Sequence, residues 1–494
     1  MDYFRPRGDI TTVLDLTDRD SQDNTYFPLD TDKSFFHVEN KTVHPSALSV
    51  QEFTQRGPAD WGQKMSFEIG SLPAGDLLQA VILQFTLGSW YNGSIIKQLQ
   101  NGEITTNPNQ SDYWTYINSL GTAIIDYAEF IVQDQTIERI SGEFIRAFFN
   151  IYGDVNNLIG ISTDAIGTTS FSYLNTATVG QTQFKPNRPY PTEDGTYFCI
   201  LPFFFIRTRL SEVFPLLSCN EGSVRIDIKL RPFDQVVRKY IGYRQNCDDT
   251  PLNKTVYFAK VGGQVVTQTP ECPPQFRDFR IITCAVLITG SLREKYIHRP
   301  HEQMVKLVQT FHFDEPLKYL VSKPNADTVE IQLPLELNHP VTELFWVFRR
   351  KAVLINNEWA NFSPAISYQT TPYKVFPQWL DSARIRLNGM ELVSESGQWF
   401  REHIASVHKG GIIAYNSHMY GYSFAKYPDS HQPSGTGNMS RTTSVTLNLK
   451  VNVPIPVNVG DFNPNVAGWE VFVFAIHYNW LRFENGICNR MFID

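Results

Sequence analysis

The sequence of 494 residues contains no hydrophobic run long enough to cross a membrane as a helix. Its longest apolar stretch, YFCILPFFFI at 197–206, is about half the length that a transmembrane helix needs, and Pro202 interrupts it. The N-terminal segment also lacks the apolar core of a secretory signal peptide. We therefore expect neither a transmembrane helix nor entry into the secretory route.

Cysteine is scarce, and its spacing does not indicate a metal site. The sequence has no CxxC pair and no cluster of histidine with cysteine, so we expect reduced, scattered thiols at Cys199, Cys219, Cys247, Cys272, Cys284 and Cys488. A GxSxG elbow, a P-loop and a glycine-rich dinucleotide fingerprint are also missing. We expect no catalytic residue, no metal site and no cofactor. Acidic pairs of the glycosidase type cannot be placed in space from sequence, so that possibility stays open.

Basic residues do not dominate the chain, whose formal net charge is −7. A protein that packages nucleic acid needs a basic patch or tail, so we expect no direct contact with nucleic acid. Residues 1–30 are mostly acidic and polar, which indicates an extended arm rather than a DNA-binding tail.

Aromatic residues, by contrast, are abundant, with 35 Phe, 22 Tyr and 9 Trp, and they favour strands and large buried interfaces. Convincing helices are few and short. The turn-rich segments 89–122, 150–196 and 350–378 are expected to be functional surface loops. The composition predicts an all-β chain of two tandem antiparallel jelly-roll sandwiches, with strands at 65–69, 77–87, 127–133, 223–230, 281–289, 306–313, 328–335, 343–349, 383–392, 444–451 and 470–479.

One stretch occurs twice in the chain, 255 positions apart. IDYAEFIVQDQTIERISGEF (125–144) and LDSARIRLNGMELVSESGQW (380–399) share the pairs Asp126/Asp381, Ala128/Ala383, Ser141/Ser396 and Gly142/Gly397. Each copy predicts a strand, a tight turn, a return strand and a short helix. The shared Asp, Ser and Gly are interpreted as turn and helix-start residues, not as catalytic ones.

A second repeated pair, SVRIDIKL (223–230) and SVTLNLKV (444–451), follows in the same order. Two repeats in one order predict a duplicated domain. We expect an arm at 1–30, a first roll at 31–235 and a second roll at 236–494, with the strand at 223–230 closing the first roll.

Four further motifs favour a structural or a chance interpretation. The tripeptide Arg7-Gly8-Asp9 is short enough to occur by chance. In HRPHE (298–302) Pro300 and a spacing of three do not match a zinc-binding helix. His403 and His408 are five residues apart and are expected to be structural or exposed. Glycosylation is not expected at the sequons of Asn40, Asn92, Asn109, Asn253, Asn361 and Asn438.

Several segments together resemble the major capsid proteins of nucleocytoplasmic large DNA viruses, particularly those of the iridovirus group. The most specific is a Tyr-rich strand followed by a Pro-Ser-Gly turn and Asn-x-Ser-Arg, and AVLITGSLREKY resembles the strand that opens the second roll of that family. The segments are GQKMSFEIGSLPAGDLLQAVILQF (62–85), LPFFF (201–205), NEGSVRIDIKLR (220–231), AVLITGSLREKY (285–296), MYGYSFAKYPDSHQPSGTGNMSR (419–441) and FVFAIHYNWLRFENG (472–486). The chain is longer than the compact iridovirus form, which leaves the subgroup open.

The resemblance implies a double jelly-roll subunit without enzymatic activity. It implies a homotrimer of pseudo-hexagonal outline that tiles the icosahedral shell of a virion. Its expected partners are neighbouring capsomers, minor capsid or penton proteins and an inner membrane near the capsomer base. It also implies assembly in the host cytoplasm.

Two alternatives remain open at this point. A tandem β-sandwich that binds or processes carbohydrate would need converging acidic pairs and an aromatic platform. A minor capsid paralogue of the same fold would be scarce in purified virions.

Overall fold

The computed structural model divides the chain into two compact units, residues 1–45 and 46–494, and all the elements below lie in the second unit. The structure describes residues 45–492 except for 56, 71–73, 88–103, 107–112, 118–119, 153–194, 207–211, 241–255, 261–264, 269–274, 315–327, 352–356, 358, 360, 365–372, 375–377, 409–417, 431, 453–454 and 457–467. The expected arm at 1–30 and its Arg7-Gly8-Asp9 motif lie outside the described residues. Within the described part, no helix is long and apolar enough to span a membrane.

The first roll consists of two antiparallel sheets with the main strand orders β1–β14–β3–β8 and β2–β10–β6–β7, and the short strand β9 (Phe214–Pro215) also pairs with β3. Alternate side chains of these strands point into a shared core that includes Phe67, Phe85, Phe130 and Ile226. The strands are β1 (Ser46–Thr54), β2 (Lys64–Ile69), β3 (Leu77–Leu87), β6 (Ile125–Val132), β7 (Gln135–Ser141), β8 (Gly195–Leu201), β10 (Val224–Leu230) and β14 (Phe276–Ile288).

The second roll repeats this construction with the sheets β15–β25–β17–β21 and β16–β23–β19–β20. Its own core includes Trp346, Trp379, Phe400 and Trp469, all fully buried. Its strands are β15 (His301–Phe313), β16 (Thr328–Leu335), β17 (Pro340–Arg350), β19 (Leu380–Leu387), β20 (Met390–Ser396), β21 (Met419–Ser423), β23 (Val445–Asn452) and β25 (Trp469–Glu484).

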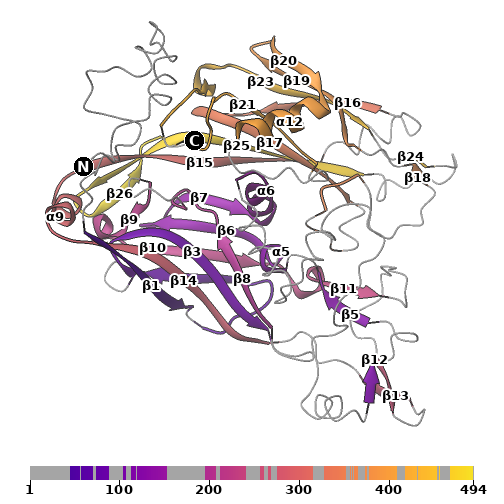
Figure 1. Ribbon diagram of the computed structural model, residues 1–494, viewed down its shortest axis with the longest axis horizontal. Helices are drawn as coiled ribbons and strands as arrows, with labels where there is room; N and C mark the ends of the chain where they lie inside the picture. Colours follow the sequence, from indigo (N-terminus) through magenta and orange to yellow (C-terminus); the bar gives the residue numbers. More distant parts are fainter. Residues whose placement is uncertain are drawn as a thin grey trace, which may run out of the picture. The chain divides into compact units, whose positions relative to one another are not determined.

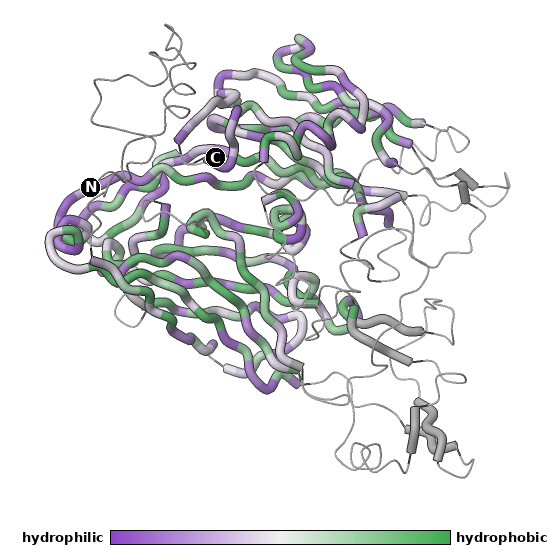
Figure 2. Tube along the Cα trace, viewed as in Figure 1, coloured by the Kyte–Doolittle hydropathy of each residue, from purple (hydrophilic) through white to green (hydrophobic). Residues whose placement is uncertain are grey.

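The two rolls have the same topology, strand for strand. If the eight strands of each roll are numbered in chain order, both sandwiches pair 1-8-3-6 in one sheet and 2-7-4-5 in the other. This is the arrangement of a jelly roll. Figure 1 shows the strands of both sandwiches, and Figure 2 shows hydrophobic positions running along the strands of both. The expected fold class, two tandem jelly rolls, is confirmed.

Shorter elements connect the rolls and extend their sheets. The helices are α5 (Leu120–Ala123), α6 (Gly142–Tyr152), α9 (Ser291–His298) and α12 (Gly397–Val407), with 3-10 turns η1 (Leu216–Cys219), η2 (Phe233–Gln235) and η3 (Met439–Arg441). The short strands are β4 (Ile104–Thr106), β5 (Tyr113–Tyr116), β9 (Phe214–Pro215), β11 (Val237–Tyr240), β12 (Val256–Lys260), β13 (Val265–Gln268), β18 (Tyr373–Lys374), β22 (Gly437–Asn438), β24 (Ile455–Pro456) and β26 (Ile487–Arg490).

The sheets do not divide at the boundary expected between residues 235 and 236. Strand β14 pairs along its length with β1 and with β3, so residues 276–288 complete the first roll. The strand at 223–230 is therefore the seventh of the first roll and not its last. Likewise, the first part of AVLITGSLREKY ends the first roll instead of opening the second. The error arose because the closing strand of a jelly roll pairs with its first strand across most of the domain, and no local signal marks that pairing.

The repeated hairpin and helix have the same local cause in both rolls. The turns are Gln133-Asp134 and Asn388-Gly389, and all four residues have positive φ, as a two-residue hairpin of this type requires. At the start of each helix, the serine Oγ accepts a hydrogen bond from a backbone N–H three residues later: Phe144 N at 3.1 Å for Ser141, and Trp399 N at 3.3 Å for Ser396.

The shared glycines that begin α6 and α12 are required by a close backbone approach. A Cβ at Gly142 would collide with the carbonyl oxygen of Ile125, and one at Gly397 would collide with that of Leu380. Ile125 and Leu380 are themselves equivalent, each starting the repeated strand. The interpretation of the shared Ser and Gly as helix-start residues is therefore confirmed. The shared Asp is not a turn or helix-start residue in the second roll. Asp381 lies on β19 and pairs with Lys450 Nζ at 2.8 Å.

We expect Gly142→Ala and Gly397→Ala each to lower the free energy of unfolding by about 1–3 kcal/mol, because the added methyl group meets backbone. In an open helix the same change stabilises by up to about 1 kcal/mol, so the sign is diagnostic. Urea unfolding followed by circular dichroism measures it, with Gln398→Ala, an exposed neighbour on α12, as the control. A stabilising effect of both glycine substitutions would contradict the explanation.

Candidate functional site

The two rolls meet where helix α6 of the first roll packs against the outer face of β17 and β25 of the second (Figure 1). The ring of Phe144 lies 5.4 Å from that of Phe474 and 6.2 Å from that of Phe345. All three rings are almost completely buried and belong to one continuous cluster that spans both rolls. We call this contact the junction.

A buried ionic network lies beside these rings. The Oε1 atom of Glu143 on α6 is 3.0 Å from Arg231 Nη2, in the first roll, and 2.8 Å from Arg349 Nη1, on β17 of the second. Arg349 also donates from Nε to Glu470 Oε1 on β25 at 2.6 Å. The other oxygen of Glu470 is 2.7 Å from His312 Nε2 on β15. Five residues from both rolls thus share one network.

The negative charges of the network lie beside its positive charges. Burial alone would raise the pKa of Glu143, but the charges of Arg349 and Arg231 outweigh it and hold the pKa at about 2. The indole ring of Trp359 lies 3.7 Å from the Arg231 guanidinium and 5.0 Å from that of Arg349. Such stacking suits the planar guanidinium group.

A second contact between the rolls involves the turn that joins β25 to β26. Gln133 Nε2 donates to Gly486 O at 3.4 Å, and Arg490 N donates to Gln135 Oε1 at 3.5 Å. Nearby, Cys219 of the first roll and Cys488 of the second are buried free thiols, and their hydrogen bond together with burial raises the pKa of Cys219. The hairpin β6–β7 is thereby held against the second roll.

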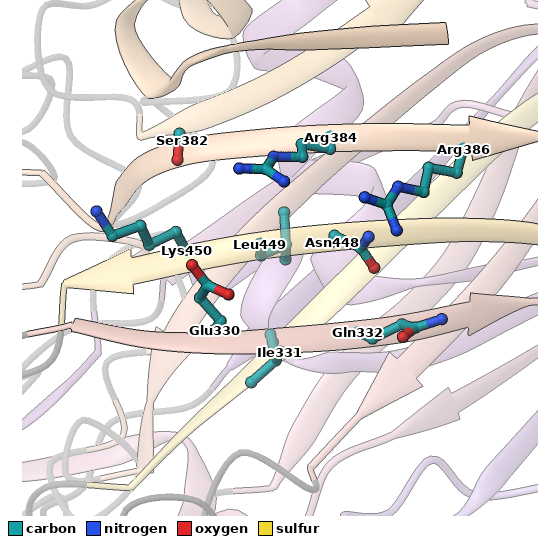
Figure 3. A pocket seen from close by; sticks show the side chains of 9 residues that line it. All are labelled: Glu330, Ile331, Gln332, Ser382, Arg384, Arg386, Asn448, Leu449 and Lys450. Carbon is teal, nitrogen blue, oxygen red and sulfur yellow. The ribbon is translucent and has the colours of Figure 1, made fainter. Parts of the chain in front are cut away.

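Two pockets of the protein have different linings. One, of about 840 Å³, lies along the junction between β6–β7 and β15. Two of its carboxylates already have partners: Glu138 accepts a hydrogen bond from Phe204 N, and Glu143 pairs with Arg231 and Arg349. The other, of about 310 Å³, lies on the outer face of β16, β23 and β19 (Figure 3). Its lining has a single carboxylate, Glu330, and no aromatic ring. It therefore lacks the acidic pair and aromatic platform that carbohydrate processing would need.

The residues singled out in the sequence do not converge on one site. His298 is exposed and pairs with Glu294, whereas His301 stacks on Phe483. His403 stacks on Trp399, at 4.7 Å between ring centroids. Among the described residues no group of three or more His, Cys, Asp or Glu is placed to hold a metal ion. Of the sequons, Asn361 and Asn438 are described, and the Asn361 side chain is bonded to Ser363.

The junction residues were not found from the sequence because they come from five separate segments. Glu143, Arg349 and Glu470 lie within or at the end of mostly apolar stretches, in GEFIRAFF, ELFWVFRR and WEVFVF. A charged residue in such a run is the one local signal that marked them.

Two family models match the chain in succession. The model described as "Major capsid protein N-terminus" matches residues 34–259, and the model described as "Large eukaryotic DNA virus major capsid protein" matches residues 293–489. The chain belongs to the family of large DNA virus major capsid proteins. The second match starts inside α9, where the sheets also divide.

Curated relatives agree with this family assignment. The major capsid protein of Pyramimonas orientalis virus is 28% identical over 228 residues, 41% of this chain and 48% of the relative. That of Lymphocystis disease virus 1 is 22% identical over 301 residues, 58% and 60% of the two chains. The chain thus spans about half to three fifths of the length of these curated relatives.

Solved capsid proteins have the same fold. A chain of the PBCV-1 virus capsid superposes with a TM-score of 0.63 at 18% identity, covering 93% of this chain and all of the other. The Faustovirus major capsid protein superposes with a TM-score of 0.63 at 12% identity, covering 96% of each chain.

A second buried ionic cluster lies inside the second roll. His408, at the end of α12, lies 2.8 Å from Glu343 Oε2 through Nε2 and 2.6 Å from Asp429 Oδ1 through Nδ1. Carboxylates only accept hydrogen bonds, so both ring nitrogens carry protons. Burial alone would lower the pKa of His408, but the two carboxylates outweigh it and raise the pKa to about 9. His408, which the sequence predicted to be either structural or exposed, is therefore buried and structural.

We expect Glu143→Ala to lower the free energy of unfolding by about 3–5 kcal/mol, because it leaves two buried guanidinium groups without their shared carboxylate. The control is Asp314→Asn, which removes the exposed partner of Lys351 and should cost at most about 1 kcal/mol. Urea unfolding at pH 7 measures both. Equal small losses would contradict the structural role of the network.

The raised pKa of His408 predicts a loss of stability in mildly alkaline solution. The unfolded pKa is near 6.5 and the folded pKa about 9, so the contribution is complete below pH 6.5 and is lost as the pH rises through 9. We expect a decrease of roughly 1–3 kcal/mol over this range. In His408→Gln this decrease should be absent. An unchanged pH profile in the variant would show that another group is responsible.

Proposed function

We propose that this chain is the structural major capsid subunit of a large DNA virus, and that it assembles as a homotrimer of pseudo-hexagonal outline. The observation that carries the proposal is the duplication itself. Two rolls of identical topology are joined so that the helix of the first covers the outer sheet face of the second. Three such chains place six similar rolls around one axis, through head-to-tail contacts that close under threefold symmetry.

In this role the capsomers tile the icosahedral shell of the virion. Neighbouring capsomers and minor capsid or penton proteins are the partners, and an inner membrane lies near the capsomer base. The subunit acts without catalysis, cofactor, metal or direct contact with nucleic acid. Assembly takes place in the host cytoplasm. The resemblance to capsid proteins along the chain and the twofold repeat of a rigid sandwich support this proposal.

Light scattering coupled to size-exclusion chromatography tests the assembly state. Three copies of the 56.6 kDa chain give about 170 kDa, and we expect that species to persist on dilution, because a ring held by three contacts dissociates less readily than an open pair. A stable monomer would contradict the proposal. Quantitative gels of purified virions separate a major subunit from a scarce paralogue, and we expect this chain to be the most abundant shell protein.

A further inference from the structure

Helices α6 and α12 are equivalent residue for residue, yet they are buried to very different extents. Each has eleven residues, and positions in the two helices differ by 255. Eight residues of α6 are buried, but only three of α12, namely Gly397, Phe400 and Ile404. Their equivalents Gly142, Ile145 and Phe149 are buried as well. These three positions therefore mark the face that each helix turns toward its own roll.

The additional buried residues of α6 form the face that meets the second roll. Glu143 binds Arg349, and Phe144 packs on Phe345 and Phe474. The five positions are Glu143, Phe144, Ala147, Phe148 and Ile151, and their equivalents in α12 are Gln398, Trp399, Glu402, His403 and Ser406. None of these five α12 residues is buried. The second roll thus presents a helix face that in the first roll is covered by a neighbouring roll.

The hairpin that precedes each helix shows the same difference. Ile137 on β7 is 1% exposed, whereas its equivalent Leu392 on β20 is 44% exposed. Met390, at the turn, is 75% exposed, and its equivalent Gln135 is held by the backbone of the second roll. The open surface therefore extends from α12 to the hairpin β19–β20.

The surface that would complement it also lies open, at the other end of the same chain. The outer face of the sheet β1–β14–β3–β8 exposes Leu48 by 73%, Val50 by 60% and Phe198 by 46%. Between them, Ile282 and Ile82 are paired across β14 and β3 and are only half-buried. These side chains form an apolar patch bordered by the ion pair of Arg280 with Glu52, and exposed apolar patches with a polar rim mark interaction sites.

In the second roll the corresponding outer sheet face is closed. Phe345 pairs with Phe474, and Val347 with Phe472, and all four are buried under α6 and its neighbours. One chain therefore contains one completed junction and the two unmatched halves of another.

We propose that α12 and the β19–β20 hairpin of one copy dock on the outer face of the β1–β14–β3–β8 sheet of a second copy, repeating the junction between chains. Trp399 takes the place of Phe144 and meets Ile82, Ile282 and Val50 of the next copy. The inference rests on the proposed homotrimer and names the surfaces that close it. Since the two surfaces differ, the contact is head-to-tail, and three copies complete a ring.

Trp399→Glu and Val50→Glu test the two halves separately, because each puts a carboxylate into one side of the proposed contact. Both side chains are at least partly exposed in the single chain, so the fold should be retained, which far-UV circular dichroism and thermal unfolding verify. We expect each variant to shift from about 170 kDa to about 57 kDa in light scattering. Tyr427→Glu, at an aromatic residue 47% exposed elsewhere in the second roll, is the control and should remain trimeric.

The outcomes separate this inference from the proposed function. A monomeric unmodified chain contradicts the trimer itself, whereas trimeric Trp399→Glu and Val50→Glu contradict only the surfaces named here. A photoreactive phenylalanine analogue placed at position 403 identifies the occupant directly. Cross-links to residues 46–54, 77–87, 195–201 or 276–288 of another copy support the proposal. Cross-links to residues 1–44, or to any other region, overturn it.

Discussion

The buried contact of α6 with the second roll determines how the two halves of this chain are joined. Glu143 can remain ionised there only because Arg231 and Arg349 approach it from different rolls, and Arg349 is in turn held by Glu470. A buried charge is tolerated only when every partner is in place. The network therefore favours a single relative placement of the rolls, while the rings of Phe144, Phe345 and Phe474 provide the apolar burial.

Duplication explains both what the rolls share and where they differ. The shared features, such as the helix-start glycines and the capping serines, are required by the backbone geometry at the start of the helix within each roll. Outward-facing positions have diverged. On equivalent strands, Glu129 of the first roll corresponds to Arg384, and Asp227 to Asn448. Two carboxylates that pair with Lys64 in the first roll are thus replaced by an arginine and an asparagine in the pocket of the second roll (Figure 3). A duplicated chain can give two similar rolls different neighbours in this way.

The features that the sequence predicted correctly depend on residues close together in the chain. Alternation located the eleven expected strands, and the repeat at 125–144 and 380–399 identified the duplicated hairpin and helix. It did not predict β1, whose side chains on both faces are largely exposed, nor the pairing of β14 with β1 across the whole roll. The junction was missed for the same reason. Its residues lie on five segments, and only the folded sheets bring Glu143, Arg349 and His312 together.

We propose that one junction is used twice, once within the chain and once between chains. A cryo-electron microscopy structure of the assembled capsomer tests it most directly. We expect one rotation, about 60° for six rolls in a ring, to relate the first roll to the second and the second to the first roll of the next copy. We also expect Trp399 to lie against the sheet that contains Ile82. A capsomer in which α12 faces solvent, or in which identical surfaces meet across a twofold axis, would contradict it.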